Sequence, residues 1–336
     1  MVANPRGGNS APARKHARIL CICLRPCRNR RQPLCRGAAK RRKLWQSRFG
    51  RAQQGGTTRT GRAAILHQLP YVAPPRARGA LRIAARAKGG TSRLSLLRQE
   101  GALRALFPRR AGVVEAVTLN TSGGATGGDS LAIEAEAGPG AHLRLTTQAA
   151  ERAYLSSGGP AAEIRNRLTV APGARLDWLP QETILYEGCD LDRRLTLDLA
   201  PGARALIVEP VIFGRAAMGE RLRDARFRDR IEIRRDGMPL YLDAQRFSGD
   251  VTAHLARPAV ASGAGAMAGL IFAAPEAEAH LTPIRAALPA TAGASLRAPD
   301  LLVLRLLAED GFALRAALLP VLDRLTDGTL PASWRL

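Results

Sequence analysis

The first part of the sequence lacks acidic residues. The first carboxylate is Glu100, and residues 1–99 carry 24 of the 51 Lys and Arg side chains. The other 27 basic residues face 28 Asp and Glu residues, so the formal net charge of +23 belongs almost wholly to the amino-terminal region. A charge of this size would suggest nucleic acid or an acidic membrane as a partner. Its distribution excludes that interpretation for the rest of the chain.

Residues 1–75 also lack sustained apolar periodicity, and they are rich in Arg, Gly, Gln and Pro. Such a segment cannot bury enough apolar surface to offset the entropy lost on ordering. We therefore predict a basic, disordered extension over residues 1–75 and a folded domain over residues 76–336. The extension has three interpretations: an arm that binds nucleic acid, a transit-like extension, or upstream sequence included by an early start assignment, which we favour.

Cysteine is scarce after the extension, where Cys189 is the only one. A single thiol cannot form an internal disulfide, which predicts a reduced, cytoplasmic domain. The extension holds the other four, Cys21, Cys23, Cys27 and Cys35. They lack the Cys-x-x-Cys spacing of a zinc knuckle, and we interpret them as incidental.

Long apolar runs are also missing. Residues 258–274 are uncharged but consist mostly of Ala, Gly and Ser, which is too weakly apolar for a membrane span. The apolar run at residues 19–24 is too short for a signal peptide. These patterns predict a soluble protein.

From Arg76 onward, apolar and polar residues alternate, which indicates half-buried strands. A Pro-Gly-Ala core recurs at Pro139, Pro172 and Pro201, with strand-like runs before and after each copy. Pro fixes the first torsion angle of a turn and Gly accepts a positive one, so we predict turns between antiparallel strands. Three copies indicate stacked or solenoid-like β-layers. Asp236-Gly237 between alternating runs predicts a further hairpin.

Helical patterns occur only near the carboxyl end. Residues 301–308 follow Asp300, a good N-cap, and residues 312–325 have apolar side chains at helical spacing. Pro320 should kink or divide the second segment. The sequence thus predicts a mainly β fold with a small C-terminal helical element near residues 300–326.

The string from Asn120 to Asp129 contains two glycine pairs, and bare backbone amides in such a string could bind a phosphate. No Lys-Ser or Lys-Thr follows the last glycine, and the charge of Asp129 opposes a phosphate. Strand patterns flank the string on both sides, so we favour a tight structural turn.

This string resembles the Asn-x-x-Gly-Gly-x-x-Gly-Gly-Asp signature of the UreD family, called UreH in some organisms. The matching residues of the turn are Asn120, Gly123, Gly124, Gly127, Gly128 and Asp129. Further blocks resemble the family in order, and they contain Thr146, Thr147, Gln148, Tyr154, Pro180, Gln181, Gly214, Arg215, Gly219 and Glu220. The closing Pro331 and Trp334 resemble its carboxyl end. The resemblance covers residues 76–336.

The resemblance implies a β-helical scaffold without catalytic residues or a bound cofactor. It implies that the protein binds apo-urease and UreF, which recruits the GTPase UreG, and that nickel passes through the assembly transiently into urease. It also implies a hetero-oligomer with UreF. The alternative function is nucleic-acid binding by the Arg-rich extension.

The residues themselves do not predict a stable nickel site, because the histidines of the domain and Cys189 are far apart in sequence. His280, beside an acidic patch after Pro275, and the carboxylates of Asp177 and Glu182 are the candidates for transient nickel contacts. We interpret the patch at His280 as a solvated loop. Glu209 could join the two carboxylates in lining a passage for ions, and Asp177 would need a partner if buried.

No catalytic motif is recognisable, since the sequence contains neither a Gly-x-Ser-x-Gly elbow nor a His-Glu-x-x-His helix. Glu220 and Asp224 lie four residues apart among several arginines, and we interpret them as ion-paired surface. The arginine-rich segment around them has two open interpretations: a docking surface for an acidic partner or an ordinary solvated face.

Overall fold

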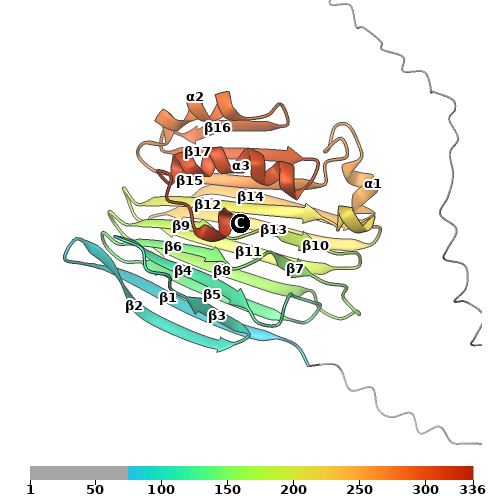
Figure 1. Cartoon of the computed structure of the whole chain (residues 1–336), viewed down its shortest axis with the longest axis horizontal. Coiled ribbons are helices and arrows are strands. Elements are labelled where there is room, and N and C mark those ends of the chain that lie inside the picture. The colour runs from blue at the N-terminus through green and yellow to red at the C-terminus, as the bar shows by residue number, and fades with distance from the viewer. Residues whose placement is uncertain (1–74, 336) are drawn as a thin grey trace, which may run out of the picture. The chain divides into compact units, whose positions relative to one another are not determined.

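The computed structural model describes residues 75–335, and the interpretations of the extension and its cysteines fall on residues that it does not describe. The described part is built of two large β-sheets whose inner faces pack against each other, with a few helices on one outer face (Figure 1). The predicted fold class, mainly β with stacked layers and a small C-terminal helix, is confirmed. None of the helices in residues 75–335 is long and apolar enough to cross a membrane.

One sheet has seven strands. In spatial order they are β14 (Met238–Gly249), β13 (Ala225–Arg235), β11 (Asp190–Leu199), β8 (Ala162–Val170), β5 (Ser130–Ala137), β1 (Arg78–Lys88) and β2 (Thr91–Gly101). The five central strands β13, β11, β8, β5 and β1 run parallel, and the outermost strands β14 and β2 each close an antiparallel hairpin.

The other sheet has ten strands. In spatial order its main path is β16 (Ala292–Ala298), β17 (Leu301–Ala308), β15 (Ala266–Ala273), β12 (Arg204–Phe213), β9 (Arg175–Leu179), β6 (His142–Thr147), β4 (Val114–Asn120) and β3 (Leu103–Leu106). Two short strands branch from it, β10 (Thr183–Leu185) and β7 (Glu151–Ala153), with β10 between β12 and β7.

The Pro-Gly-Ala turns join the two sheets and do not make hairpins, so that prediction was wrong. The strands on either side of each turn, such as β5 and β6, belong to different sheets. Successive turns bond to each other instead, as where Arg175 N–H donates to the carbonyl of Ala141 at 2.8 Å and Arg204 N–H to that of Ala174 at 2.9 Å. The backbone groups of each turn are thus satisfied by the next turn, as in the corner of a solenoid.

The Asp236-Gly237 hairpin is confirmed between β13 and β14. Both residues have positive φ angles, 51° and 75°, which suits a two-residue turn between right-twisted strands.

The predicted helix over residues 301–308 is wrong, because this segment is strand β17. It lies between β15 and β16, and four of its eight residues are buried while the other four are partly buried. An eight-residue apolar run fits a doubly buried strand as well as one side of a helix, and only the neighbouring strands decide. Asp300 caps no helix; its carboxylate pairs with Arg235 at 2.8 Å.

The helix predicted over residues 312–325 is confirmed as α3 (Gly311–Leu325). Asp310 caps its first turn by accepting the N–H of Ala313 at 2.8 Å. Pro320 does not divide the helix, which continues through it with the proline on the exposed side. The helix packs its apolar side on the outer face of the ten-stranded sheet.

Three shorter helical pieces and one helix were not predicted: α1 (Val251–Leu255), α2 (Ala277–Ala287), η1 (Ala216–Met218) and η2 (Ala332–Trp334). The acidic patch beside His280 is therefore part of α2 and not a solvated loop. Helix α2 covers β16 and β17 next to α3 (Figure 1).

Candidate functional site

The glycine-pair string joins β4 to β5 and crosses from one sheet to the other. Asp129 holds its end, because one carboxylate oxygen accepts the N–H of Ala77 at 2.7 Å and the other accepts that of Thr126 at 2.8 Å. Asn120 holds its start by donating to the carbonyl of Gly124 at 3.1 Å. Because the side chains at both of its ends bond within the turn or to the neighbouring Ala77, the string has the geometry of a structural turn.

Gly124 and Gly127 are required by close packing. A Cβ at Gly124 would lie 2.3 Å from the ring of Tyr154, and one at Gly127 would lie 2.1 Å from the hydroxyl of Ser156. Gly123 and Gly128 adopt positive φ angles of 81° and 88°, and Gly124 has one of 158°. The signature turn and Tyr154 thus form one packed unit.

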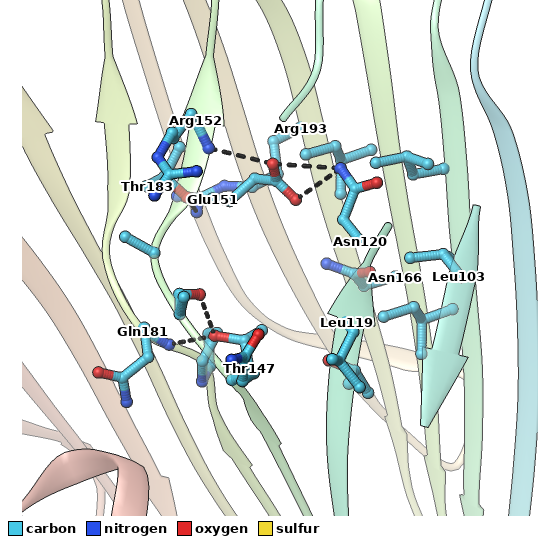
Figure 2. A pocket seen from close by; sticks show the side chains of 18 of the residues that line it. Leu103, Leu119, Asn120, Thr147, Glu151, Arg152, Asn166, Gln181, Thr183 and Arg193 are labelled. Carbon is cyan, nitrogen blue, oxygen red and sulfur yellow. Dashed lines mark hydrogen bonds between the residues drawn. The ribbon is translucent and has the colours of Figure 1, made fainter. Parts of the chain in front are cut away.

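A cavity of about 380 Å³ lies between the two sheets beside this turn. Figure 2 shows side chains from both sheets that point into it. The polar residues that line it include Thr118, Asn120, Thr147, Gln148, Glu151, Asn166, Gln181, Thr183, Arg193 and Glu209. The predicted signature residues Asn120, Thr147, Gln148, Pro180 and Gln181 are therefore brought together at one cavity.

Glu151 lies on one side of the cavity, where Asn120 Nδ2 donates to its carboxylate at 3.2 Å (Figure 2). Burial raises its pKa, and this outweighs hydrogen bonds from the Arg152 N–H and Asn120. The carboxylate is thus easier to protonate than an exposed glutamate.

A charged cluster, Arg193, Asp229, Glu209 and Trp178, lies on the inner faces of the two sheets. Arg193 makes a two-point ion pair with Asp229, at 3.0 and 2.7 Å, and its third nitrogen lies 2.6 Å from Glu209. Trp178 Nε1 donates to the other oxygen of Glu209 at 2.8 Å. Three of these four side chains, those of Arg193, Glu209 and Trp178, line the cavity.

The two carboxylates outnumber the one guanidinium in this cluster. Burial raises the pKa of Glu209 to about 6, although Arg193 acts in the opposite direction. Burial alone would lower the pKa of Arg193, but Asp229 and Glu209 outweigh it and raise that pKa. Arg193 therefore stays charged, and Glu209 is the member of the cluster that exchanges a proton near neutral pH.

Two residues that line the cavity each have a buried amide atom without a hydrogen-bond partner among residues 75–335, Oδ1 of Asn166 and Nε2 of Gln181. The Gln181 amide extends toward Arg315 on the outer face, to which its oxygen is bonded. Buried polar atoms normally find a partner, so the Asn166 oxygen indicates that the cavity holds water or a polar guest.

Asp177 lies on the opposite, outer face of the ten-stranded sheet and is completely buried, with the partners that its burial requires. Its carboxylate lies 2.8 Å from Nε2 of His142, and it accepts from Arg144 at 2.9 Å and from Arg175 at 2.8 Å. Burial would raise its pKa, but His142 and the two arginines hold that pKa well below its usual range. All of these contacts lie outside the cavity.

The same outer face anchors the end of the chain. Arg144 donates to the backbone carbonyl and hydroxyl of Thr329, and Trp334 donates to the carbonyl of Leu179 at 2.9 Å. Arg315 pairs with Glu182 at 2.9 Å. Two more hydrogen bonds join residues of the signature blocks to this part of the structure: Thr146 bonds to Ser333, and Gln181 bonds to Arg315. Glu182 and Asp177 are thus engaged in holding the carboxyl-terminal segment.

The Gly214-Arg215 and Gly219-Glu220 blocks form an exposed loop after β12. Arg215 makes a two-point ion pair with Glu220, both distances being 2.9 Å, and stacks over Tyr186 at 4.4 Å. The hydrogen bond from Arg215 lowers the pKa of Glu220 to about 2. The predicted ion pairing is confirmed for Glu220, but Glu220 and Asp224 share no helix.

His280 lies on α2 with its ring 5.4 Å from that of Phe272. Burial lowers its pKa, so the ring is neutral at pH 7. Asp177, Glu182 and His280 do not converge, and residues 75–335 contain no group of three or more His, Cys, Asp or Glu side chains that could hold a metal ion. Cys189 is buried, and burial raises the pKa of its thiol to about 12.

Among the polar residues of the cavity and the charged cluster, Glu209 was predicted from the sequence, whereas Glu151, Asn166, Arg193 and Asp229 were not. The strand patterns do contain a signal for three of them. In β8, β11 and β13 the inward positions are apolar except for one polar residue each, and these are Asn166, Arg193 and Asp229. A polar residue on the inward face of a strand needs a partner across the core.

Comparison with known proteins identifies the family. Residues 77–335 match the family model described as "UreD urease accessory protein". The chain is 52% identical over 262 residues to a urease accessory protein UreD of Roseobacter denitrificans, covering 78% of this chain and 96% of that protein. It is 54% identical over 250 residues to the UreD of Ruegeria pomeroyi, covering 74% and 97%. Against the UreD of Rhizobium etli it is 44% identical over 265 residues, covering 78% and 97%. The chain belongs to the UreD family of urease accessory proteins.

Proposed function

We propose that this protein is a non-catalytic, cytoplasmic maturation factor that takes part in inserting nickel into the urease active site. In this proposal it binds apo-urease and UreF, and through UreF the GTPase UreG, as a hetero-oligomer. The observation that carries the proposal is the match of the folded domain, over residues 77–335, to urease accessory proteins.

The chemistry of the described side chains supports a scaffold. The exposed Arg215 is ion-paired to the largely covered Glu220, and the only cysteine of the domain is a buried, protonated thiol. Asp177 and Glu182, two candidates for transient nickel contact, are committed to arginines that anchor the carboxyl-terminal segment. These contacts stabilise the fold and leave the cavity as the place to handle a small ion.

The cavity between the sheets is the candidate passage for nickel. The residues that line it offer oxygen atoms, including the carboxylates of Glu151 and Glu209 and the Asn166 amide, and oxygen ligands without thiolate or imidazole hold nickel weakly. Weak ligands suit a passage, because an ion that binds too tightly does not leave. Arg193 keeps the number of free negative charges small, which limits affinity further.

The binding part of the proposal is tested by co-expression of the full chain with UreF and the urease subunits, followed by a pull-down on the chain. UreF and apo-urease should both be recovered. Recovery of neither, from cells in which the chain is folded and all partners are expressed, would overturn the proposal.

The passage is tested with Glu209→Gln, which keeps the shape of the side chain and its hydrogen bond from Trp178 but removes the charge. Asp224→Asn, an exposed residue outside the cavity, is the matched control. Urease matured with E209Q should contain less nickel than urease matured with D224N, at equal recovery of the complex. Equal nickel contents would exclude Glu209 from the route.

A further inference from the structure

Strand β2 forms an exposed edge of the seven-stranded sheet. It pairs with β1 along one side, and within residues 75–335 no strand pairs with its other side. Nine of its eleven residues, from Arg93 to Gly101, are exposed. An edge of this length offers a row of backbone N–H and C=O groups to another chain (Figure 1).

The edge is strongly basic. Residues 75–113 contain ten Lys or Arg residues and one acid, Glu100, whereas residues 114–336 contain 24 basic residues and 27 acids. The positive charge of the described domain is thus concentrated on β1, β2, β3 and the loop that follows them. Such a concentration favours an acidic partner.

Like charges lie directly opposite each other in the β1–β2 hairpin. Arg82 is in register with Arg98, and Arg86 is in register with Arg93. Arg82 and Arg98 have acidic neighbours, at Glu134 and Glu100. Arg86 and Arg93 form no ion pair with any residue from 75 to 335, so their mutual repulsion is not compensated within that part of the chain.

Apolar side chains accompany the charges on this edge. Leu94, Leu96 and Leu97 are 40%, 47% and 39% exposed. Leu96 lies opposite Ala84 on the outer face of the sheet, while Leu97 lies opposite the buried Ile83 and extends the inner face. An added strand would cover leucines on both faces and bring its own side chains beside the arginines.

We propose that β2 is the docking site for an acidic, extended segment of a partner protein, which adds to the sheet as a strand next to β2. Its carboxylates lie beside Arg93 on β2 and offset the positive charge that Arg93 and Arg86 share across the hairpin. Its backbone completes the hydrogen-bonding row of β2. The site goes beyond the function proposed above and does not depend on it, because no residue of β2 lines the cavity.

Two other occupants fit the edge less well. A second copy of β2 would bring Arg93 and Arg98 against an equally basic edge, and charged edge residues of one sign oppose such pairing. The chain's own residues 1–74 contain no acid, so they do not complement the edge either.

The proposal is tested with the full chain and a synthetic peptide of alternating Glu and Val, as long as β2. Binding is measured by fluorescence anisotropy, and hydrogen exchange of the protein reports where the peptide binds. A Lys-Val peptide and a Glu-Val peptide methylated on every backbone nitrogen are the controls. The methylated peptide keeps its charge but has no N–H to donate to the backbone of β2.

Two double variants separate this edge from other basic parts of the chain. Arg86→Glu with Arg93→Glu reverses the proposed site. Arg221→Glu with Arg223→Glu makes the same change in charge on the exposed loop before β13. Both pairs are exposed, and circular dichroism checks that both variants are folded.

The Glu-Val peptide should slow exchange in β2, and R86E/R93E should weaken its binding roughly tenfold relative to R221E/R223E. The Lys-Val and methylated peptides should each bind the unaltered chain at least roughly tenfold more weakly than the Glu-Val peptide does. Equal binding by the two variants, or binding without protection in β2, would overturn the proposal. So would tight binding of the methylated peptide, or a higher affinity of the site for a duplex DNA probe than for the peptide.

Discussion

The buried arginine of the cavity gives the sharpest test of how the two sheets are held together. Arg193→Met removes the guanidinium but keeps most of the apolar volume of the side chain. Asp229 would lose both hydrogen bonds of its two-point ion pair, and Glu209 would keep only the bond from Trp178. Two carboxylates would then share a buried site without a positive charge.

Breaking a buried ion pair by removing one partner costs about 3–5 kcal/mol. Because two carboxylates lose their partner here, we expect a value near the upper end of that range for R193M. A typical domain is stabilised by about 5–15 kcal/mol in total, so the variant would keep only a small part of its stability.

The assay is urea unfolding followed by circular dichroism, with Arg194→Met as the matched control. Arg194 is the next residue on β11, its side chain is 57% exposed, and it pairs with Asp192 at 3.2 Å. An exposed pair contributes at most about 1 kcal/mol. Equal losses in R193M and R194M at pH 7 would refute the reasoning. The loss in R193M should also shrink as the pH falls, because protonation neutralises the two carboxylates.

Three further predictions concern single positions. Gly124→Ala should destabilise the fold by more than about 2 kcal/mol, because its Cβ would overlap Tyr154. Gly123→Ala meets no atom within 4 Å and should cost only about 1 kcal/mol for its positive φ. Urea unfolding compares the two variants, and equal losses of stability would contradict the packing argument. Glu209 has a folded-state pKa of about 6 against 4.5 for an unperturbed group, so the folded state binds the proton more tightly. Stability should therefore fall by about 2 kcal/mol in all as the pH rises from well below 4.5 to well above 6. This slope should be missing in E209Q; an unchanged slope would assign the proton to another group. Trp334→Ala should lower the free energy of unfolding by about 3–5 kcal/mol, because it removes a fully buried ring and its hydrogen bond to Leu179. Limited proteolysis should then cleave the chain after Leu325. Resistance of this segment to protease would show that Arg144 and Arg315 hold it without the tryptophan.

The strands and turns were predictable because their signals are local. Alternation located β5, β8 and β11, and the Asp236-Gly237 pair located a hairpin. The sheet to which each strand belongs was not predictable from the turns. A Pro-Gly turn has the same torsion angles whether its flanking strands pair with each other or join two layers, and only bonds between residues about thirty positions apart separate the two.

Residues 301–308 show a second limit of local signals. An apolar run of eight residues satisfies a buried strand and a helix face equally, and its burial between β15 and β16 decides for the strand. The charged cluster could not be predicted from the sequence for a related reason. Arg193 and Asp229 are 36 residues apart, and they meet because β11 and β13 pair in parallel with these two residues in register.

The most direct test of the account is the nickel content of urease. Urease subunits and the other accessory proteins are expressed in nickel-supplemented cells with and without this chain, and nickel per purified urease is measured by mass spectrometry. We expect urease to assemble in both cases and to be poor in nickel without the chain. A normal nickel content in its absence would contradict the account.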